Sequence, residues 1–225
     1  MDEPYRLLLL LGWGTLVGLD LVSVPQAMIA RPLVAGTVAG WIAGDLQSGL
    51  YAGVLLELFA LDVLPVGASR YPDYGPATVG AAAFAAGAGP WQTSLGVATA
   101  MATAVALIGD WSLYSLRHRI ARDIQRCASG LAAGDPAVVR RLQYASITRD
   151  AVRSLGLTAL ALALGLAALR WLALDPVTAR LLTIVAVGSG VAAVVGGAMR
   201  SAGRGARLRW LGIGMLAGTA LAWAG

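Results

Sequence analysis

The residues best suited to chemistry are acidic and amide side chains that interrupt apolar runs in the first third of the chain. Glu57 lies inside the run Val54–Leu61, where an ionised carboxylate costs about 3 kcal/mol or more unless it faces a partner or water. The other candidates are Asp20, Gln26, Asp45, Asp62 and Asp73. All except Asp62 stand at expected helix breaks, where freed backbone groups and side chains can line a cavity.

Carboxylates and amides of this kind hydrogen-bond well to uncharged, hydroxyl-rich ligands such as sugars when an aromatic or apolar wall backs them. Glu57, Asp73 and Gln26 would supply the hydrogen bonds. The aromatic wall would come from Trp41, Tyr71 or Tyr74. Two structural alternatives stay open: Glu57 makes a buried hydrogen bond, and Asp62 marks a helix end at the membrane interface.

Other chemistries fit the sequence poorly, so we expect no catalytic residue, metal or cofactor. His118 is the only histidine and stands between two arginines, which argues against a histidine metal site and a Ser-His-Asp triad. Cys127 is the only cysteine and excludes an internal disulfide. The chain has no phosphate-cradling P-loop.

The composition predicts an all-α, polytopic integral membrane protein. Of the 225 residues, 58% are hydrophobic and only 13% are charged, whereas a soluble domain carries about 25% charged residues. The mean hydropathy is +0.72. Alternation with a period of two is absent, which argues against a β-barrel. No cleavable signal is expected, because the first apolar run follows Met1-Asp2-Glu3 without a basic segment.

We expect a single membrane domain, 1–225, with three parts. Residues 1–109 hold membrane segments with broken or re-entrant helices, since the run 33–44 is too short to cross about 30 Å of hydrocarbon. Residues 110–153 form a basic helical hairpin with a turn before Pro136. Residues 154–225 hold three membrane helices, the last over 208–224.

The charge distribution orients this arrangement. The net charge is +5 and every basic residue is arginine. The hairpin contains eight arginines: Arg117, Arg119, Arg122, Arg126, Arg140, Arg141, Arg149 and Arg153. Because these residues lie between apolar runs, they indicate a cytoplasmic, positive-inside segment rather than a nucleic-acid site. The hairpin is therefore expected on the cytoplasmic side of a membrane, and the apolar runs are expected in contact with lipid.

Glycines recur at a spacing of four residues in the short segments. Gly36, Gly40 and Gly44 share one helix face, and Gly49 and Gly53 repeat the spacing. Glycine at this spacing lets helix backbones approach closely in lipid. We interpret the pattern as tight helix packing.

A composite pattern over residues 12–76 resembles one family. It consists of Arg31-Pro32-Leu33-Val34-Ala35-Gly36, Gly40, Gly44-Asp45, Gly49, Gly53, Leu56-Glu57-Leu58, Gly67-Ala68 and Pro72-Asp73. This pattern resembles enzyme IIC, the membrane channel subunit of the mannose/fructose/sorbose family of the bacterial sugar phosphotransferase system. The chain departs from the enteric mannose-type members at Asp62 and Pro65 and at Arg70-Tyr71.

The resemblance implies that the chain lies in the bacterial cytoplasmic (inner) membrane, and that a hexose crosses this membrane and is phosphorylated by a separate IIB subunit. Its partners would be a IID membrane subunit and the IIA and IIB phosphocarriers, with IIC–IID pairs forming oligomers. The phosphoryl-carrying histidines would sit on IIA and IIB, so this subunit is not catalytic alone. The substrate-binding residues expected are Gln26, Glu57, Asp73, Asp45 and Asp20, and the site-shaping residues are Arg31, Pro32 and Gly67.

Two further hypotheses remain. One is a non-transporting membrane scaffold or regulatory subunit of the same fold, which keeps the packing glycines but does not bind sugar. The other is an unrelated secondary transporter driven by protons through Glu57. Direct sugar binding, and the appearance of sugar phosphate as the product, would separate these hypotheses.

Overall fold

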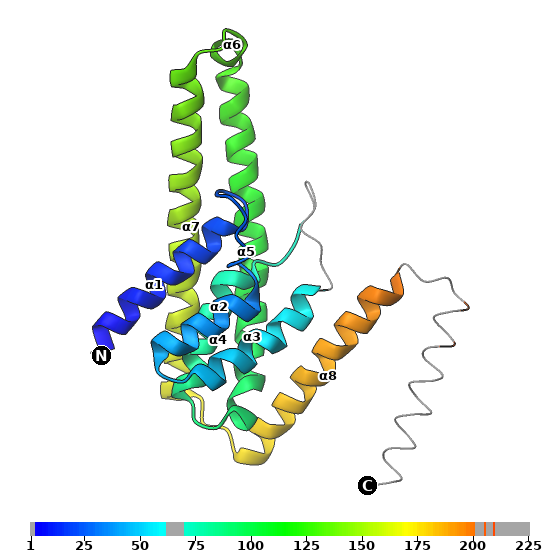
Figure 1. Cartoon of the computed structure of the whole chain (residues 1–225). Helices are drawn as coiled ribbons and strands as arrows, with labels where there is room; N and C mark the ends of the chain where they lie inside the picture. The colour runs from blue at the N-terminus through cyan, green and yellow to red at the C-terminus, as the bar shows by residue number, and fades with distance from the viewer. Residues whose placement is uncertain (1–2, 62–69, 201–204, 206–208, 210–225) are drawn as a thin grey trace.

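The computed structural model describes residues 3–61, 70–200, 205 and 209. The regular structure of these residues is α-helical, which confirms the predicted fold class. Figure 1 shows the helices, which are α1 (Glu3–Asp20), α2 (Pro32–Ala43), α3 (Leu46–Leu61), α4 (Tyr74–Gly87), α5 (Trp91–Arg126), α6 (Ala128–Ala132), α7 (Pro136–Trp171) and α8 (Pro176–Arg200).

Proline and aspartate mark several helix starts. Pro32 opens α2 after the extended residue Arg31. Pro136 opens α7, where the Asp135 side chain accepts a hydrogen bond of 2.8 Å from the Ala137 N–H. Proline suits the first turn because its missing N–H has no partner there. The helix starts expected at Pro32 and Pro136 are confirmed.

The short helices α2 and α3 form a hairpin whose backbones touch. A Cβ added to Gly40 would lie 2.6 Å from the Gly49 Cα, and a Cβ added to Gly36 would lie 2.8 Å from the Gly53 Cα. The turn between the helices uses Gly44, whose φ of 99° favours glycine. The expectation of tight packing is confirmed for Gly36, Gly40, Gly49 and Gly53, whereas Gly44 lies beyond the end of α2 and makes the turn instead.

Helix α4 lies at the centre of the bundle. Its residues from Gly75 to Ala82 are all buried, and it packs against α1, α2, α3, α5 and α7. Small side chains such as Ala77 and Ala81 allow these helices to approach. The segment that leads into Tyr74 is therefore attached directly to the most buried helix of the bundle.

Among the described residues, three helices are long and apolar enough to cross a membrane: α5, α7 and α8. The expected hairpin boundaries, 109/110 and 153/154, fall inside α5 and α7, which are continuous over 36 residues each. The hairpin is the distal part of these two helices, which extend beyond the bundle and are joined at α6 (Figure 1). The expected membrane helix over 208–224 lies almost wholly outside the described residues, as do Asp62, Pro65 and Gly67.

Candidate functional site

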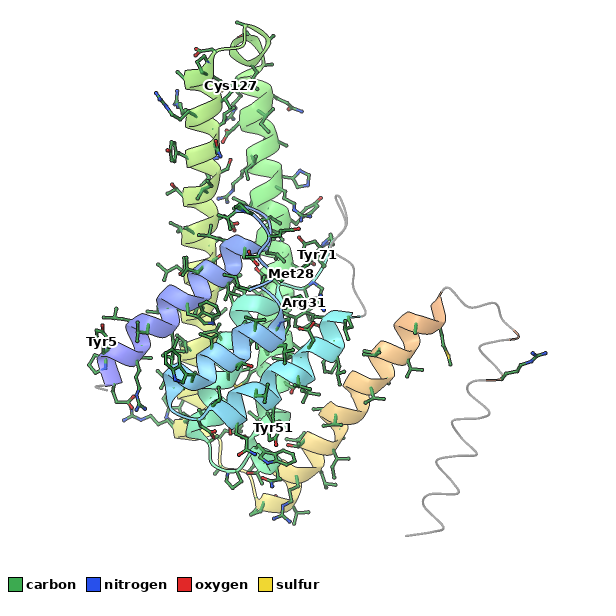
Figure 2. All side chains as sticks on the ribbon, viewed as in Figure 1. Tyr5, Met28, Arg31, Tyr51, Tyr71 and Cys127 are labelled. Carbon is green, nitrogen blue, oxygen red and sulfur yellow. The ribbon has the colours of Figure 1, made fainter. Side chains whose placement is uncertain are left out.

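A cavity of about 260 Å³ lies where the loop after α1, the start of α2 and the segment before α4 meet. It is lined by Asp20, Leu21, Gln26, Met28, Ala30, Arg31, Pro32, Ala60, Tyr71, Pro72, Tyr74 and Gly75. Met28, Arg31 and Tyr71 gather near the base of the α5–α7 hairpin, far from Cys127 at its tip (Figure 2). Four of the predicted site residues, Asp20, Gln26, Arg31 and Pro32, thus line one cavity.

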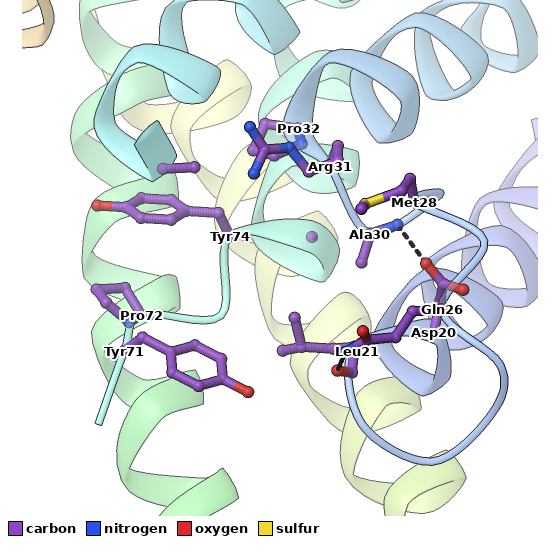
Figure 3. A pocket seen from close by; sticks show the side chains of 12 residues that line it. Asp20, Leu21, Gln26, Met28, Ala30, Arg31, Pro32, Tyr71, Pro72 and Tyr74 are labelled. Carbon is purple, nitrogen blue, oxygen red and sulfur yellow. Dashed lines mark hydrogen bonds between the residues drawn. The ribbon is translucent and has the colours of Figure 1, made fainter. Parts of the chain in front are cut away.

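The loop 21–31 is held by the buried carboxylate of Asp20. This carboxylate accepts hydrogen bonds from the backbone N–H groups of Ala27, at 2.6 Å, and Ala30, at 3.0 Å. The exposed Gln26 side chain donates to the Leu21 carbonyl at 3.1 Å. Figure 3 shows Leu21, Gln26 and Met28 across the cavity from Tyr71 and Tyr74. Asp20 therefore shapes the loop that bounds the cavity.

Glu57 does not line the cavity itself, but it is bound to the start of α2 beside Arg31, which does. Its Oε1 pairs with the Arg31 guanidinium, and its Oε2 accepts a 3.1 Å hydrogen bond from the Leu33 N–H. The positive end of the α2 dipole also favours a carboxylate at this place. The side chains of Arg31 and Glu57 are 38% and 15% exposed, so the pair is partly accessible.

Tyr71 and Tyr74 form the aromatic side of the cavity. The Tyr71 ring is buried, and its hydroxyl accepts a 2.7 Å hydrogen bond from Arg117 on α5. Trp41, the third aromatic candidate, is 71% exposed near the other end of α2. The two tyrosines, and not Trp41, line this cavity.

Asp73 lies behind the cavity rather than in its lining. Its Oδ2 is 2.7 Å from Nη1 of Arg153, whose Nε is 2.8 Å from Oδ1 of Asp150. Asp150 also accepts a hydrogen bond from the Ser23 hydroxyl. The side chains of Asp73 and Asp150 are buried, and that of Arg153 is 8% exposed. This buried ionic network holds Asp73 toward α5 and α7.

Asp45 lies at the end of α2 opposite Pro32, outside the lining of the cavity. Its Oδ1 accepts a 3.1 Å hydrogen bond from the Ser48 N–H in the first turn of α3. This is a helix-capping contact, which satisfies a backbone donor that the helix itself cannot pair. The structure therefore does not bring Asp45 together with the other candidates.

Sequence reasoning missed Asp150 and the position of Arg153. The sequence analysis includes Arg153 among the positive-inside arginines of the hairpin, whereas in the structure it is nearly buried and bound to two carboxylates. One signal was present: Asp150 and Arg153 are three residues apart where α7 becomes apolar, a spacing that places them on one helix face. The partner across the chain, Asp73, is visible only in three dimensions.

The cavity offers a carboxylate, an amide, a guanidinium and two phenol rings, with apolar side chains between them. Such groups donate and accept hydrogen bonds and cover an apolar ring face. The chemistry matches an uncharged ligand rich in hydroxyl groups.

The family model for the sorbose-specific IIC component of the phosphotransferase system matches residues 5–202. This chain belongs to that family. The resemblance that the sequence pattern indicated is confirmed. As a member of this family with three membrane-length helices among its described residues, the IIC chain is a multi-pass protein of the inner membrane.

Curated relatives match a part of the chain. The sorbose-specific IIC component of Klebsiella pneumoniae is 41% identical over 76 residues, which are 34% of this chain and 28% of that protein. The sorbose-specific component of Lacticaseibacillus casei is 35% identical over 30% of this chain and 24% of that protein. The fructose permease IIC component of Bacillus subtilis is 38% identical over 33% of this chain and 27% of that protein. The matched segments thus span less than a third of each relative.

Solved structures share the fold over nearly the whole chain. A structure described as a membrane protein has a TM-score of 0.75 at 20% identity and covers 97% of this chain and 88% of its own. The mannose transporter ManYZ, solved in complex with microcin E492, has a TM-score of 0.61 at 21% identity. It covers 96% of this chain and 88% of its own.

Proposed function

We propose that this chain is the membrane channel subunit through which a hexose of the mannose, fructose or sorbose class crosses the inner membrane. The transport is coupled to phosphorylation of the sugar by a separate IIB subunit. The observation that carries the proposal is a cavity of about 260 Å³ in a chain of the IIC family, with an aromatic and largely apolar wall that a few polar side chains interrupt. Sites for drug-sized ligands have volumes of about 300–1,000 Å³. The cavity lies just below this range, so its volume suits a smaller ligand such as a monosaccharide.

The lining residues have distinct roles in this proposal. Gln26 hydrogen-bonds to sugar hydroxyls, while Tyr71 and Tyr74 cover the ring. Asp20, which is 2% exposed, holds the loop that carries Gln26. A hydroxyl placed between Arg31 and Glu57 accepts from the guanidinium and donates to the carboxylate, so it replaces their direct contact without leaving either charge unpaired. Proline at position 32 fixes the start of α2 beside this pair.

The partners follow from the family. A IID membrane subunit pairs with this chain, pairs assemble into oligomers, and lipid surrounds them. The IIA and IIB phosphocarriers deliver the phosphoryl group on the cytoplasmic side, toward which the α5–α7 hairpin points. Positive-inside charge supports this orientation, since most hairpin arginines lie in the distal parts of α5 and α7.

The test is uptake of radiolabelled mannose, fructose and sorbose by cells that lack their own transporters of this family and carry this chain with its partner subunits. Glu57→Gln removes the negative charge beside Arg31. We expect a reduction in uptake of about tenfold or more, because hydrogen bonds to charged groups contribute roughly 1.5–3 kcal/mol. The amount of chain in the membrane should stay unchanged.

Glu3→Gln is the matched control, because Glu3 is the only other glutamate, is exposed and lies outside this cavity. Its uptake should equal that of the wild type. If Glu57→Gln transports normally, Glu57 is not part of the sugar site. If no hexose is taken up by the wild type, the transport proposal fails.

A non-transporting scaffold of the same fold is the second candidate. One observation favours it: both Glu57 oxygens and both Asp20 oxygens already have partners within the chain. Isothermal titration of the purified complex with the same three hexoses separates the two candidates. Binding supports the transporter, and the absence of heat with all three sugars supports the scaffold.

A further inference from the structure

We propose that Arg153 is a positioning residue for the sugar cavity, which holds two of the cavity's walls together through Asp73 and Asp150 without lining the cavity itself. The inference rests on the proposed function, because it takes this cavity to be the sugar site. It also gives Asp73 a different role from the direct sugar ligand that the sequence suggested.

The first wall is the segment before α4. Asp73 stands between Pro72 and Tyr74, both of which line the cavity, while its own carboxylate turns away to meet Nη1 of Arg153 at 2.7 Å. The Asp73 N–H donates to the Ala106 carbonyl of α5 at 3.0 Å. Because the backbone of Asp73 is fixed on one side and its carboxylate on the other, the tyrosine-bearing segment cannot shift without breaking these contacts.

Close packing against α5 supports the same wall. A Cβ added to Gly109 would lie 2.6 Å from the Cβ of Asp73. Only glycine at position 109 lets Asp73 reach this depth, since real Cβ atoms do not approach so closely. The position of Asp73 is therefore fixed by packing against α5 as well as by the ion pair with Arg153 of α7.

The second wall is the loop 21–31. The Ser23 hydroxyl donates to Oδ2 of Asp150, whose Oδ1 accepts from Nε of Arg153 at 2.8 Å. Ser23 is two residues from Leu21, which lines the cavity, and the loop continues to Gln26 and Met28. One guanidinium thus connects the loop, through Asp150, to the segment that carries the tyrosines.

The geometry requires an arginine. Its planar fork donates from Nε to one carboxylate and from Nη1 to the other, whereas a lysine ammonium is a single point charge on a flexible stem. With both carboxylates buried, each needs its own donor. A lysine would keep the positive charge, but its ammonium would not hold Asp73 and Asp150 in fixed directions relative to each other.

The experiment compares Arg153→Lys and Ser23→Ala with the wild type in the uptake assay, using mannose, fructose and sorbose. A misplaced wall weakens sugar binding, so we expect KM to rise about tenfold in Arg153→Lys, in keeping with one weakened charged hydrogen bond. In Ser23→Ala we expect a rise of roughly threefold, since a neutral donor contributes less. Vmax per inserted chain should change little in both.

Arg149→Lys and Ser115→Ala are the matched controls. Arg149 lies on α7 one turn before Arg153 and makes an exposed ion pair with Asp123 of α5. The Ser115 hydroxyl donates to the Trp111 carbonyl within α5. Both should keep the wild-type KM. A purely structural role of Arg153 would lower the amount of inserted chain and Vmax while KM stays constant, and that result overturns the proposal.

A second readout does not depend on transport. Ala30→Cys, in a Cys127→Ser background, places the only thiol of the chain on the half-buried part of the loop that lines the cavity. Labelling by a maleimide should become several-fold faster when Arg153→Lys or Ser23→Ala is added, and should not change with the two controls. Unchanged labelling overturns the proposal. Faster labelling in a chain that takes up none of the three hexoses supports the positioning role while the transport function fails.

Discussion

The two sides of the cavity are held by different physical means. On one side, α2 and α3 pack through glycines whose backbones touch, and a partly exposed pair, Arg31–Glu57, ties their ends together. On the other side, the segment before α4 and the loop after α1 are joined to α7 by a network in which Asp73, Arg153 and Asp150 are nearly inaccessible.

The contrast separates charges that can serve a ligand from charges that can only build a site. Glu57 is 15% exposed beside the cavity, so a sugar hydroxyl can exchange with its arginine. Asp73 is 1% exposed and its partner Arg153 is 8% exposed, so neither can meet a ligand without a rearrangement. Carboxylates that both interrupt apolar runs in the sequence therefore differ in function because their side chains are buried to different extents.

The strongest way to break the buried side is Arg153→Leu. It leaves two buried carboxylates without their cation, and removing one partner of a buried ion pair costs roughly 3–5 kcal/mol. We expect a large loss of folded protein, measured as the yield of monodisperse chain in detergent and its thermal unfolding temperature. Adding Asp73→Asn and Asp150→Asn should recover part of the loss, because no uncompensated charge then remains.

Arg149→Leu is the comparison for that variant. Its ion pair with Asp123 is exposed, so water replaces the contact and the unfolding temperature should hardly move. Equal destabilisation by the two leucine variants would show that burial of the network does not matter, and the distinction between the two sides would lose its basis.

The glycine-packed side is tested by Gly40→Ala. The added Cβ would lie 2.6 Å from the Gly49 Cα, so α2 and α3 must separate. Overpacking of this kind costs about 1–3 kcal/mol, which is less than the loss expected for Arg153→Leu. Gly12→Ala serves as the control, since a Cβ at Gly12 meets nothing within 4 Å and alanine favours a helix by about 1 kcal/mol. The two alanine variants should shift the unfolding temperature in opposite directions.

The sequence predicted the features that depend on local pattern. Glycine spacing predicted the contact between α2 and α3, Pro32 and Pro136 predicted helix starts, and low charge predicted a membrane fold. The helix starts and the hairpin contact depend on residues close together in the sequence, and the membrane fold depends on composition, so both can be predicted without knowing which distant residues meet.

The parts that the sequence could not show depend on contacts between distant residues. Arg153 and Asp73 are 80 residues apart, and nothing local to either shows that they meet. The positive-inside rule counts arginines in a segment and takes no account of whether an individual side chain, such as that of Arg153, is buried. Asp45 was grouped with the site because it follows a helix break, but that break lies at the far end of α2.

The smallest effect is expected in the loop that connects the two sides, at Met28. Its φ of 64° lies in the left-handed region, which costs a non-glycine residue roughly 1–2 kcal/mol, while its side chain is 64% exposed and loses little burial on truncation. Met28→Gly relieves this strain but adds freedom to the unfolded chain, which costs about 0.5–1 kcal/mol. The net result should be a stabilisation of about 0.5 kcal/mol, seen as a small rise in unfolding temperature.

Ala27→Gly is the control, because Ala27 does not have a positive φ. This variant adds only freedom to the unfolded chain and should lower the unfolding temperature. A fall in both variants would mean that the loop is not strained, so that Asp20 and Ser23 would hold it at no conformational cost.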